Sequence, residues 1–240
     1  MKTELYFSHI VSCGADKTVI LWDVGTGQII KRFRGHAGKV SCVKYNEEST
    51  VAVSGSHDNT VICWDIKGRK NEPIQILREA KDCITSIQVT DHEILVGSLD
   101  SYIRCYDIRM GKITRDFIGD PVIATCFTQD SQCILASSCD IIRLMDKETG
   151  ELLTEYKGHK TGDYMIESCL DSKDKYILSG STDGNLYCWE LISNKLVKKF
   201  PHPNQKTVHS VSPHPSGNYF LTAAGHNIYL WGSPTSQAEG

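Results

Sequence analysis

The chain has 240 residues, with 26 lysines and arginines against 29 aspartates and glutamates, and a formal net charge of −3. This balance provides no long-range attraction to nucleic acid or to an anionic membrane, so we expect neither as a partner. No apolar stretch approaches membrane-spanning length, and residues 1–8 lack the apolar core of a signal peptide. We therefore expect a soluble intracellular protein.

One repeating unit accounts for the predicted elements along the chain. Its marker recurs in steps of 42, 42, 39, 44 and 42 residues, at Trp22, Trp64, Tyr106, Met145, Trp189 and Trp231. Between the markers, short segments rich in β-branched and aromatic residues alternate with Gly, Ser, Asp and Asn turns, which predicts strands. A period of about 40 to 45 residues with a Trp-Asp ending is typical of a β-propeller blade. The sequence therefore predicts an all-β propeller with about five to six blades' worth of chain.

The markers also predict the blade boundaries. We expect a partial first blade over 1–33, full blades over 34–78, 79–118, 119–157 and 158–200, an incomplete last blade over 201–232, and a flexible tail over 233–240. Incomplete end blades leave unpaired strand edges, and such edges recruit other chains. The chain alone is therefore expected to self-associate.

Two units carry a full set of four polar and aromatic residues, which we interpret as structural. The sets are His36, Ser54, Asp58 and Trp64, then His159, Ser179, Asp183 and Trp189. A Ser, a His and an Asp can form a hydrolase triad. Here the set repeats at nearly constant spacing and includes an indole N–H, which hydrolysis does not need. We expect these residues to clamp strands and turns through a buried polar network, with no catalytic residue among them.

No motif predicts a metal or a cofactor. Four histidines late in the chain fit no standard ligand spacing, and we interpret them as solvated loop residues: His202, His209, His214 and His226. The ten cysteines form no C-x-x-C pair and mostly fall inside predicted strands, which favours buried free thiols. Glycine-rich phosphate-binding motifs do not occur.

The Gly-His, Ser, Asp and Trp-Asp series resembles that of the WD-repeat family. Two stretches, Arg32-Phe-Arg-Gly-His-Ala-Gly-Lys-Val40 and Asp146-Lys-Glu-Thr-Gly-Glu-Leu-Leu153, are similar to a narrower group that organises mitogen-activated protein kinase cascades. The resemblance implies a seven-bladed ring, so this chain would be an N-terminally truncated one. It also implies a non-catalytic scaffold in cytoplasm and nucleus, with kinase-cascade components and spliceosome components of pre-mRNA splicing as partners.

An alternative function comes from Tyr106-Asp107-Ile108-Arg109. This stretch is similar to the Trp-Asp-x-Arg box of propellers that serve as substrate receptors for cullin-type ubiquitin ligases, with Tyr in place of Trp. Such short motifs also arise by chance.

The loop that enters the first strand of a blade and the turn before its third strand reach the same face. We predict that their tips form the partner surface, because loops on a rigid scaffold commonly carry binding. The candidate residues are Lys39, His57, Lys81, Leu99, Lys160, Tyr164 and Thr182.

Overall fold

The computed structural model describes residues 8–162, 164–203 and 205–232. These residues form 22 β-strands and no helix, which confirms the all-β prediction. Accordingly, the described part of the chain contains no helix that could span a membrane. The predicted flexible tail over 233–240 lies outside the described residues, as do residues 1–7 of the predicted first blade.

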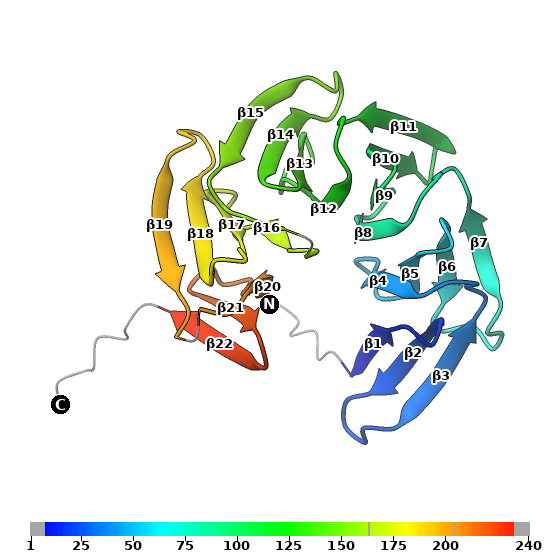
Figure 1. Ribbon diagram of the computed structural model, residues 1–240. Helices are drawn as coiled ribbons and strands as arrows, with labels where there is room; N and C mark the ends of the chain where they lie inside the picture. Colours follow the sequence, from blue (N-terminus) through cyan, green and yellow to red (C-terminus); the bar gives the residue numbers. More distant parts are fainter. Residues whose placement is uncertain (1–7, 163, 204, 233–240) are drawn as a thin grey trace, which may run out of the picture. The chain divides into compact units, whose positions relative to one another are not determined.

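The strands form six antiparallel sheets (Figure 1). The chain divides into two compact units, one ending at Val122 and the other beginning at Ile123. The first unit holds three of the sheets. Sheet 1 contains β1 (His9–Cys13), β2 (Thr18–Asp23) and β3 (Ile29–Arg34); sheet 2 contains β4 (Val40–Tyr45), β5 (Val51–Ser56), β6 (Val61–Asp65) and β7 (Pro73–Leu77); sheet 3 contains β8 (Ile84–Val89), β9 (Glu93–Ser98), β10 (Tyr102–Asp107) and β11 (Lys112–Phe117).

The second unit repeats the pattern. Sheet 4 contains β12 (Val122–Phe127), β13 (Cys133–Ser138), β14 (Ile141–Asp146) and β15 (Leu152–Lys157); sheet 5 contains β16 (Ser168–Leu170), β17 (Tyr176–Ser179), β18 (Asn185–Glu190) and β19 (Leu196–Pro201); sheet 6 contains β20 (Val208–Pro213), β21 (Tyr219–Ala224) and β22 (Asn227–Gly232). Each sheet is a meander in which consecutive strands pair. Among the described residues, sheets 1 and 6 have three strands and the other four sheets have four.

Within each unit, apolar side chains of one sheet pack against the first strand of the next. Val19 and Leu21 of β2 share a cluster with Val40 of β4, and Leu186 of β18 shares one with Val208 of β20. The β-branched and aromatic residues that predict strands are therefore also the residues that hold neighbouring sheets together.

The glycine that directly follows the serine of each full set allows this close approach. A Cβ on Gly55 would lie 2.4 Å from Ile84 Cγ2, and a Cβ on Gly180 would lie 2.1 Å from the Val208 carbonyl oxygen. Any larger residue would push the next sheet away, so the Ser-Gly pair in β5 and after β17 is a packing requirement.

Where an aspartate directly follows the marker, it holds the turn between the marker's strand and the next strand of the sheet. Asp23 accepts the Thr26 N–H at 2.7 Å, and Asp65 accepts the Gly68 N–H at 2.7 Å. The aspartates after the third and fourth markers do the same for Met110 and Thr149, each at 2.8 Å. This Asx-turn geometry explains why an aspartate follows four of the six markers.

Candidate functional site

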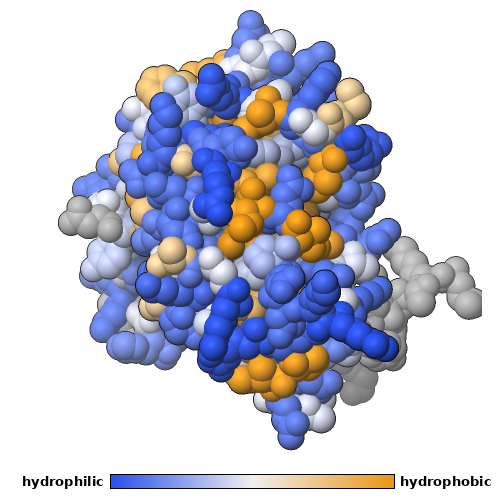
Figure 2. Space-filling model, turned by 90° about the vertical axis from the view of Figure 1, so that its right-hand side faces the viewer, coloured by the Kyte–Doolittle hydropathy of each residue, from blue (hydrophilic) through white to orange (hydrophobic). Residues whose placement is uncertain are grey.

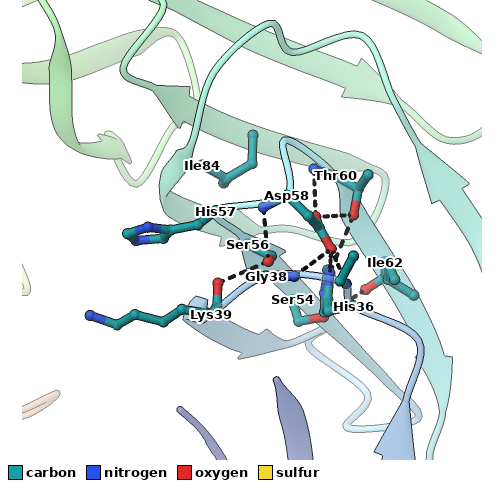
Figure 3. A network of polar contacts seen from close by, with 12 residues as sticks. His36, Gly38, Lys39, Ser54, Ser56, His57, Asp58, Thr60, Ile62 and Ile84 are labelled. Atoms are coloured by element: carbon teal, nitrogen blue, oxygen red, sulfur yellow. Dashed lines mark hydrogen bonds and ion pairs between the residues drawn. The ribbon is translucent and has the colours of Figure 1, made fainter. Parts of the chain in front are cut away.

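The polar set of sheet 2 is a closed network that joins three segments of the chain (Figure 3). His36 lies in the loop between β3 and β4, Ser54 in β5, and Asp58 in the turn between β5 and β6. His36 Nδ1 lies 3.0 Å from Asp58 Oδ2, and His36 Nε2 lies 2.8 Å from Ser54 Oγ. The Trp64 indole N–H donates to Ser54 Oγ at 2.8 Å.

The charge state of His36 gives this network one direction. Burial lowers the pKa of His36 despite the neighbouring Asp58 carboxylate, so the imidazole is neutral at pH 7. Burial alone would raise the pKa of Asp58, but hydrogen bonds from Thr60, the Ala37 amide and His36 outweigh it and lower the pKa to about 2. The indole N–H then donates to the serine, the serine O–H to His36 Nε2, and His36 Nδ1–H to Asp58.

Asp58 collects further donors from the entry loop and its own turn. The Ala37 N–H donates to Oδ2 at 2.6 Å, while the Thr60 hydroxyl and N–H donate to Oδ1 at 2.5 and 3.0 Å. These bonds tie the loop that enters β4 to the turn that precedes β6.

The geometry of the set does not suit a hydrolase. Ser54 is fully buried, and its hydroxyl is engaged by both Trp64 and His36. A nucleophile needs an open side for the reacting carbonyl and an oxyanion site about 3 Å away. The network instead holds a loop and a turn in place.

The equivalent set in sheet 5 differs, although the four residue types are the same. Ser179 Oγ donates to the Gly180 carbonyl oxygen at 3.1 Å instead of joining His159 to the indole of the set. Asp183 Oδ2 accepts the Tyr187 hydroxyl at 2.7 Å. His159 is buried and its Nδ1 atom has no hydrogen-bond partner among the described residues. The four residues of sheet 5 therefore do not form the network seen in sheet 2.

Two local differences account for this, and the first is the number of residues from the histidine to the residue that is held against the turn. In sheet 2 the residue held against the turn is Lys39, three positions after His36, with its carbonyl accepting the His57 N–H at 2.8 Å. In sheet 5 the equivalent carbonyl belongs to Lys160, directly after the histidine, and accepts the Thr182 N–H at 2.8 Å. The tether between histidine and anchor is two residues shorter, so the backbone places the histidine of sheet 5 differently.

The second difference is the residue four positions after the aspartate. It is Ile62 in sheet 2, which leaves Asp58 free for His36, but Tyr187 in sheet 5, whose hydroxyl donates to Asp183. Burial lowers the pKa of His159, while the carboxylates of Asp183 and of Asp140, in the turn between β13 and β14, oppose the shift.

Two further polar networks were not predicted, and the first lies in sheet 3. Arg104 is buried and donates two bonds to Asp100, from Nη1 to Oδ1 at 3.0 Å and from Nη2 to Oδ2 at 2.7 Å. Arginine thus replaces histidine as the partner of the turn aspartate. The signal in the sequence is a charged residue at a position that is apolar in sheets 1 and 2.

In sheet 6, His202 Nε2 lies 2.7 Å from Thr222 Oγ1, which also accepts the Trp231 indole N–H at 2.8 Å. His202 is buried, so its interpretation as a solvated loop histidine was wrong. Pro201 stands where the full sets have Gly, and Thr222 where they have Ser, which concealed the equivalence.

The described residues give little support to a metal site or to a reactive buried thiol. Among the described residues, no group of three or more His, Cys, Asp or Glu side chains could hold a metal ion. All ten cysteines are free thiols, and burial raises the pKa of Cys42 to about 12 and that of Cys188 to about 11. Such thiols are poor nucleophiles at neutral pH.

The structure places the candidate partner residues at loop and turn tips. In the first unit, Lys39 and Lys81 are exposed, and Figure 3 shows the Lys39 and His57 side chains extending away from the polar set on the same side. Asn59 of the His57 turn donates to the Lys81 carbonyl oxygen at 3.2 Å, and the Leu99 N–H donates to the carbonyl oxygen two residues further along that loop at 3.0 Å. The first-unit members therefore belong to one connected set of loops.

In the second unit, Lys160 and Tyr164 are exposed and Thr182 is half-buried. Lys160 and Thr182 are joined through the backbone, and the Tyr164 ring contacts His209 with centroids 5.3 Å apart. Whether these residues act on a partner stays a prediction.

The repeat matches a known family model, "WD domain, G-beta repeat", over residues 6–23, 27–65, 150–190 and 194–232. The chain therefore belongs to the WD-repeat family, and its sheets are of the β-propeller blade type.

Within that family it is similar to proteins named WD repeat domain-containing protein 83. The rat protein is 50% identical over 286 residues, covering 97% of this chain and 87% of the relative. The human protein is 46% identical over 285 residues, with the same coverage. A homologue from Dictyostelium discoideum is 36% identical over 254 residues, covering 93% of this chain and 78% of the relative. The mammalian matches span more residues than the 240 of this chain, by about the length of one repeat.

Proposed function

We propose that this protein is a non-catalytic scaffold that binds other proteins through the loop and turn tips of its blades. The observation that carries the proposal is the use of the repeated polar residues. The polar groups of Ser54, His36 and Asp58 bond one another and the Ala37 amide, and these bonds hold the loop before β4 against the turn before β6. A rigid frame that uses its polar residues to present loops is suited to binding.

The tips so presented have a composition that favours a protein partner. Lys39, Lys81 and Lys160 supply positive charge, and Tyr164 supplies an exposed aromatic ring. Aromatic and cationic anchors dominate many protein interfaces, and an acidic, partly apolar partner surface would complement them.

The outermost strands of the sheets are the other surface on which a partner could bind. They expose apolar side chains such as Ile74 of β7 and Leu153 of β15. On the face drawn in Figure 2, apolar side chains stand in small groups separated by hydrophilic ones. Lysines on these strands also discourage strand addition, so we favour the loop tips as the working surface.

The resemblance to kinase-cascade organisers supports a finer proposal. We propose that the partners are kinase-cascade components and spliceosome components, and that the protein works in cytoplasm and nucleus. Sequence similarity to the WD repeat domain-containing protein 83 group supports this assignment, whereas fold alone would not.

The alternative, a cullin-ligase substrate receptor, rests on Tyr106-Asp107-Ile108-Arg109. Asp107 already has a structural role in its turn, as do the equivalent aspartates of three other sheets. Arg109 and Ile108 are exposed, which keeps the motif testable.

The test is affinity purification of the tagged chain from cells, followed by mass spectrometry. Kinases and splicing factors among the partners support the scaffold, and a cullin adaptor in their place supports the alternative.

Variants test the binding surface itself. A Lys39→Ala, Lys160→Ala, Tyr164→Ala variant should lose its partners. The matched control, Lys112→Ala, Phe117→Ala, Lys198→Ala, removes two lysines and one aromatic from outermost strands and should keep them. Full retention by the first variant would show that the tips are not the binding surface.

A further inference from the structure

A groove between sheets 5 and 6 lies apart from the loop and turn tips. It has a volume of about 630 Å³, and all of its lining lies between Asp171 and Gly232, so the second unit alone forms it. One wall is the loop between β16 and β17 with parts of β17, β18 and β19, and the other is the turn between β20 and β21 with parts of β21 and β22. That loop precedes β17, whereas the tip residue Thr182 follows it. The groove is therefore a second candidate binding site at the other end of the sheet.

Aromatic rings form the apolar part of the groove. The centroids of Phe200 and Trp231 lie 5.4 Å apart, and Phe220 stacks on Trp231 with centroids 6.0 Å apart. These three rings are half-buried, and Tyr219, which also lines the groove, is 38% exposed. The Trp231 indole N–H already donates to Thr222, so the indole presents its apolar ring surface. Such a surface can receive an apolar or aromatic side chain.

Three lysines give the groove a positive charge. Lys173, Lys175 and Lys198 line it and are exposed, and Asp171 is the one acidic side chain among the described residues of the lining. Asp171 Oδ1 accepts the N–H groups of Lys175 and Tyr176 at 2.6 and 2.8 Å, so this carboxylate is engaged by its own loop. Within the described part of the chain, none of the three lysines forms an ion pair. Their charge is therefore available to a ligand.

This combination of charge and aromatic rings sets the groove apart from its neighbour. Gly232 directly follows the sixth marker, where the other five units carry Asp or Glu. A Cβ on Gly232 would lie 2.4 Å from Tyr219 Cδ1, so the tyrosine ring lies against the glycine. In the groove between sheets 4 and 5, Lys157 is paired with Glu155 at 2.6 Å. Sheet 6 thus lacks the usual acid and adds an aromatic ring, which leaves its groove basic and apolar.

We propose that this groove binds an extended acidic segment of a partner protein, with an apolar or aromatic side chain between its Asp and Glu residues. The lysines complement the acids, and the aromatic rings receive the apolar side chain. Val197, Lys198 and Gly217 of the lining are exposed, so the groove is open to solvent. Small-molecule sites enclose most of their ligand, and an open groove is better suited to a length of chain.

The end of this chain does not match that description. Residues 233–240 follow the groove directly and contain one acidic side chain, Glu239, and no aromatic one. A segment with a single acid would leave most of the lysine charge without a partner. The occupant that the charges favour is therefore a segment of another protein.

The test is fluorescence anisotropy of a labelled peptide, Asp-Glu-Phe-Glu-Asp, titrated with the whole 240-residue chain up to about 200 μM, a range that measures weak binding. Binding should saturate and should weaken as salt is added, because salt screens exposed charges. A peptide with Ala in place of Phe should bind at least about fivefold more weakly, since an interface anchor is lost.

Variants locate the binding. Lys173→Glu with Lys198→Glu should weaken peptide binding at least about tenfold. Lys173→Gln with Lys198→Gln removes the charges with less disturbance and should have an intermediate effect. The matched control, Lys195→Glu with Lys206→Glu, makes the same change in net charge at two exposed lysines outside the groove and should bind within about twofold of the wild type. Circular dichroism should be the same for all variants.

The outcome is independent of the loop-tip proposal. The Lys39→Ala, Lys160→Ala, Tyr164→Ala variant should bind the peptide like the wild type, because none of its substitutions lines the groove. A wild type that does not bind the peptide, or that binds the Ala peptide equally well, would overturn the proposal. So would a Lys173→Glu, Lys198→Glu variant that binds as tightly as its matched control.

Discussion

Sheets 2 and 5 carry the same four residue types at nearly the same spacing, yet their polar contacts differ. In sheet 2 the indole, hydroxyl, imidazole and carboxylate form a continuous chain of hydrogen bonds. In sheet 5 the serine turns to its own backbone, the aspartate bonds a tyrosine, and one histidine nitrogen is left without a partner in the described structure.

The difference shows that a motif fixes positions in a repeat but not the bonds made there. What decides the bonds is the length of chain between the histidine and its anchor, which is three residues in sheet 2 and one in sheet 5. The residue four places after the aspartate, Ile62 or Tyr187, then decides whether the carboxylate remains available to the histidine. The two sheets should therefore respond differently to the same substitutions.

The largest contrast is expected at the aspartates. Asp58→Ala leaves the donors of the entry loop, Thr60 and His36 without their acceptor. Since each buried donor left without a partner costs about 1–3 kcal/mol, this variant should lower the unfolding free energy by about 2–3 kcal/mol. Asp183→Ala removes fewer buried partners and should cost about 1 kcal/mol. Urea unfolding measures both, with exposed Asp91→Ala as a control expected within about 0.5 kcal/mol of wild type.

The serines provide a contrast free of cavity effects. Ser54→Ala removes the atom that joins Trp64 to His36 and should cost about 1–2 kcal/mol. Ser179→Ala removes only a bond to the Gly180 carbonyl and should cost less than about 0.5 kcal/mol. Equal losses in thermal or urea unfolding would mean that the two serines have the same structural role.

Acidification should weaken the fold through the buried histidines of both sheets and of sheet 6. Burial lowers the pKa of His36, His159 and His202 below the ordinary value of about 6.5. Between the lowered pKa values and about 6.5, the unfolded chain binds more protons than the native one, so stability falls as the pH drops through that window.

Urea unfolding at about pH 7.5 and about pH 5.5, on either side of the ordinary histidine pKa, should show this loss. The loss should shrink in a His159→Gln variant, because glutamine has no proton to gain. An unchanged pH dependence in that variant would contradict the buried neutral state of His159.

How much of the molecule was predictable from the sequence follows from what each feature depends on. Strands, turns and blade period depend on local composition, so Trp64, Trp189 and the Asp turns indicated them correctly. The networks depend on loop length and on side chains from other strands, which is why the roles of Tyr187 and Arg104 were not predicted. The role of His202 was missed because the flanking Gly and Ser that mark the other sets are absent around it.

The most direct test of the difference between the two sheets is a pair of double-mutant cycles in urea unfolding. One cycle combines His36→Ala with Asp58→Ala, and the other combines His159→Ala with Asp183→Ala. Directly bonded residues show coupling of about 0.5–3 kcal/mol, so the first pair should couple by about 1 kcal/mol or more. The second pair shares no hydrogen bond and interacts only through the charge of Asp183 and the shared neighbour Tyr187, so its coupling should be clearly smaller than that of the first pair. Equal coupling in the two sheets would contradict the account.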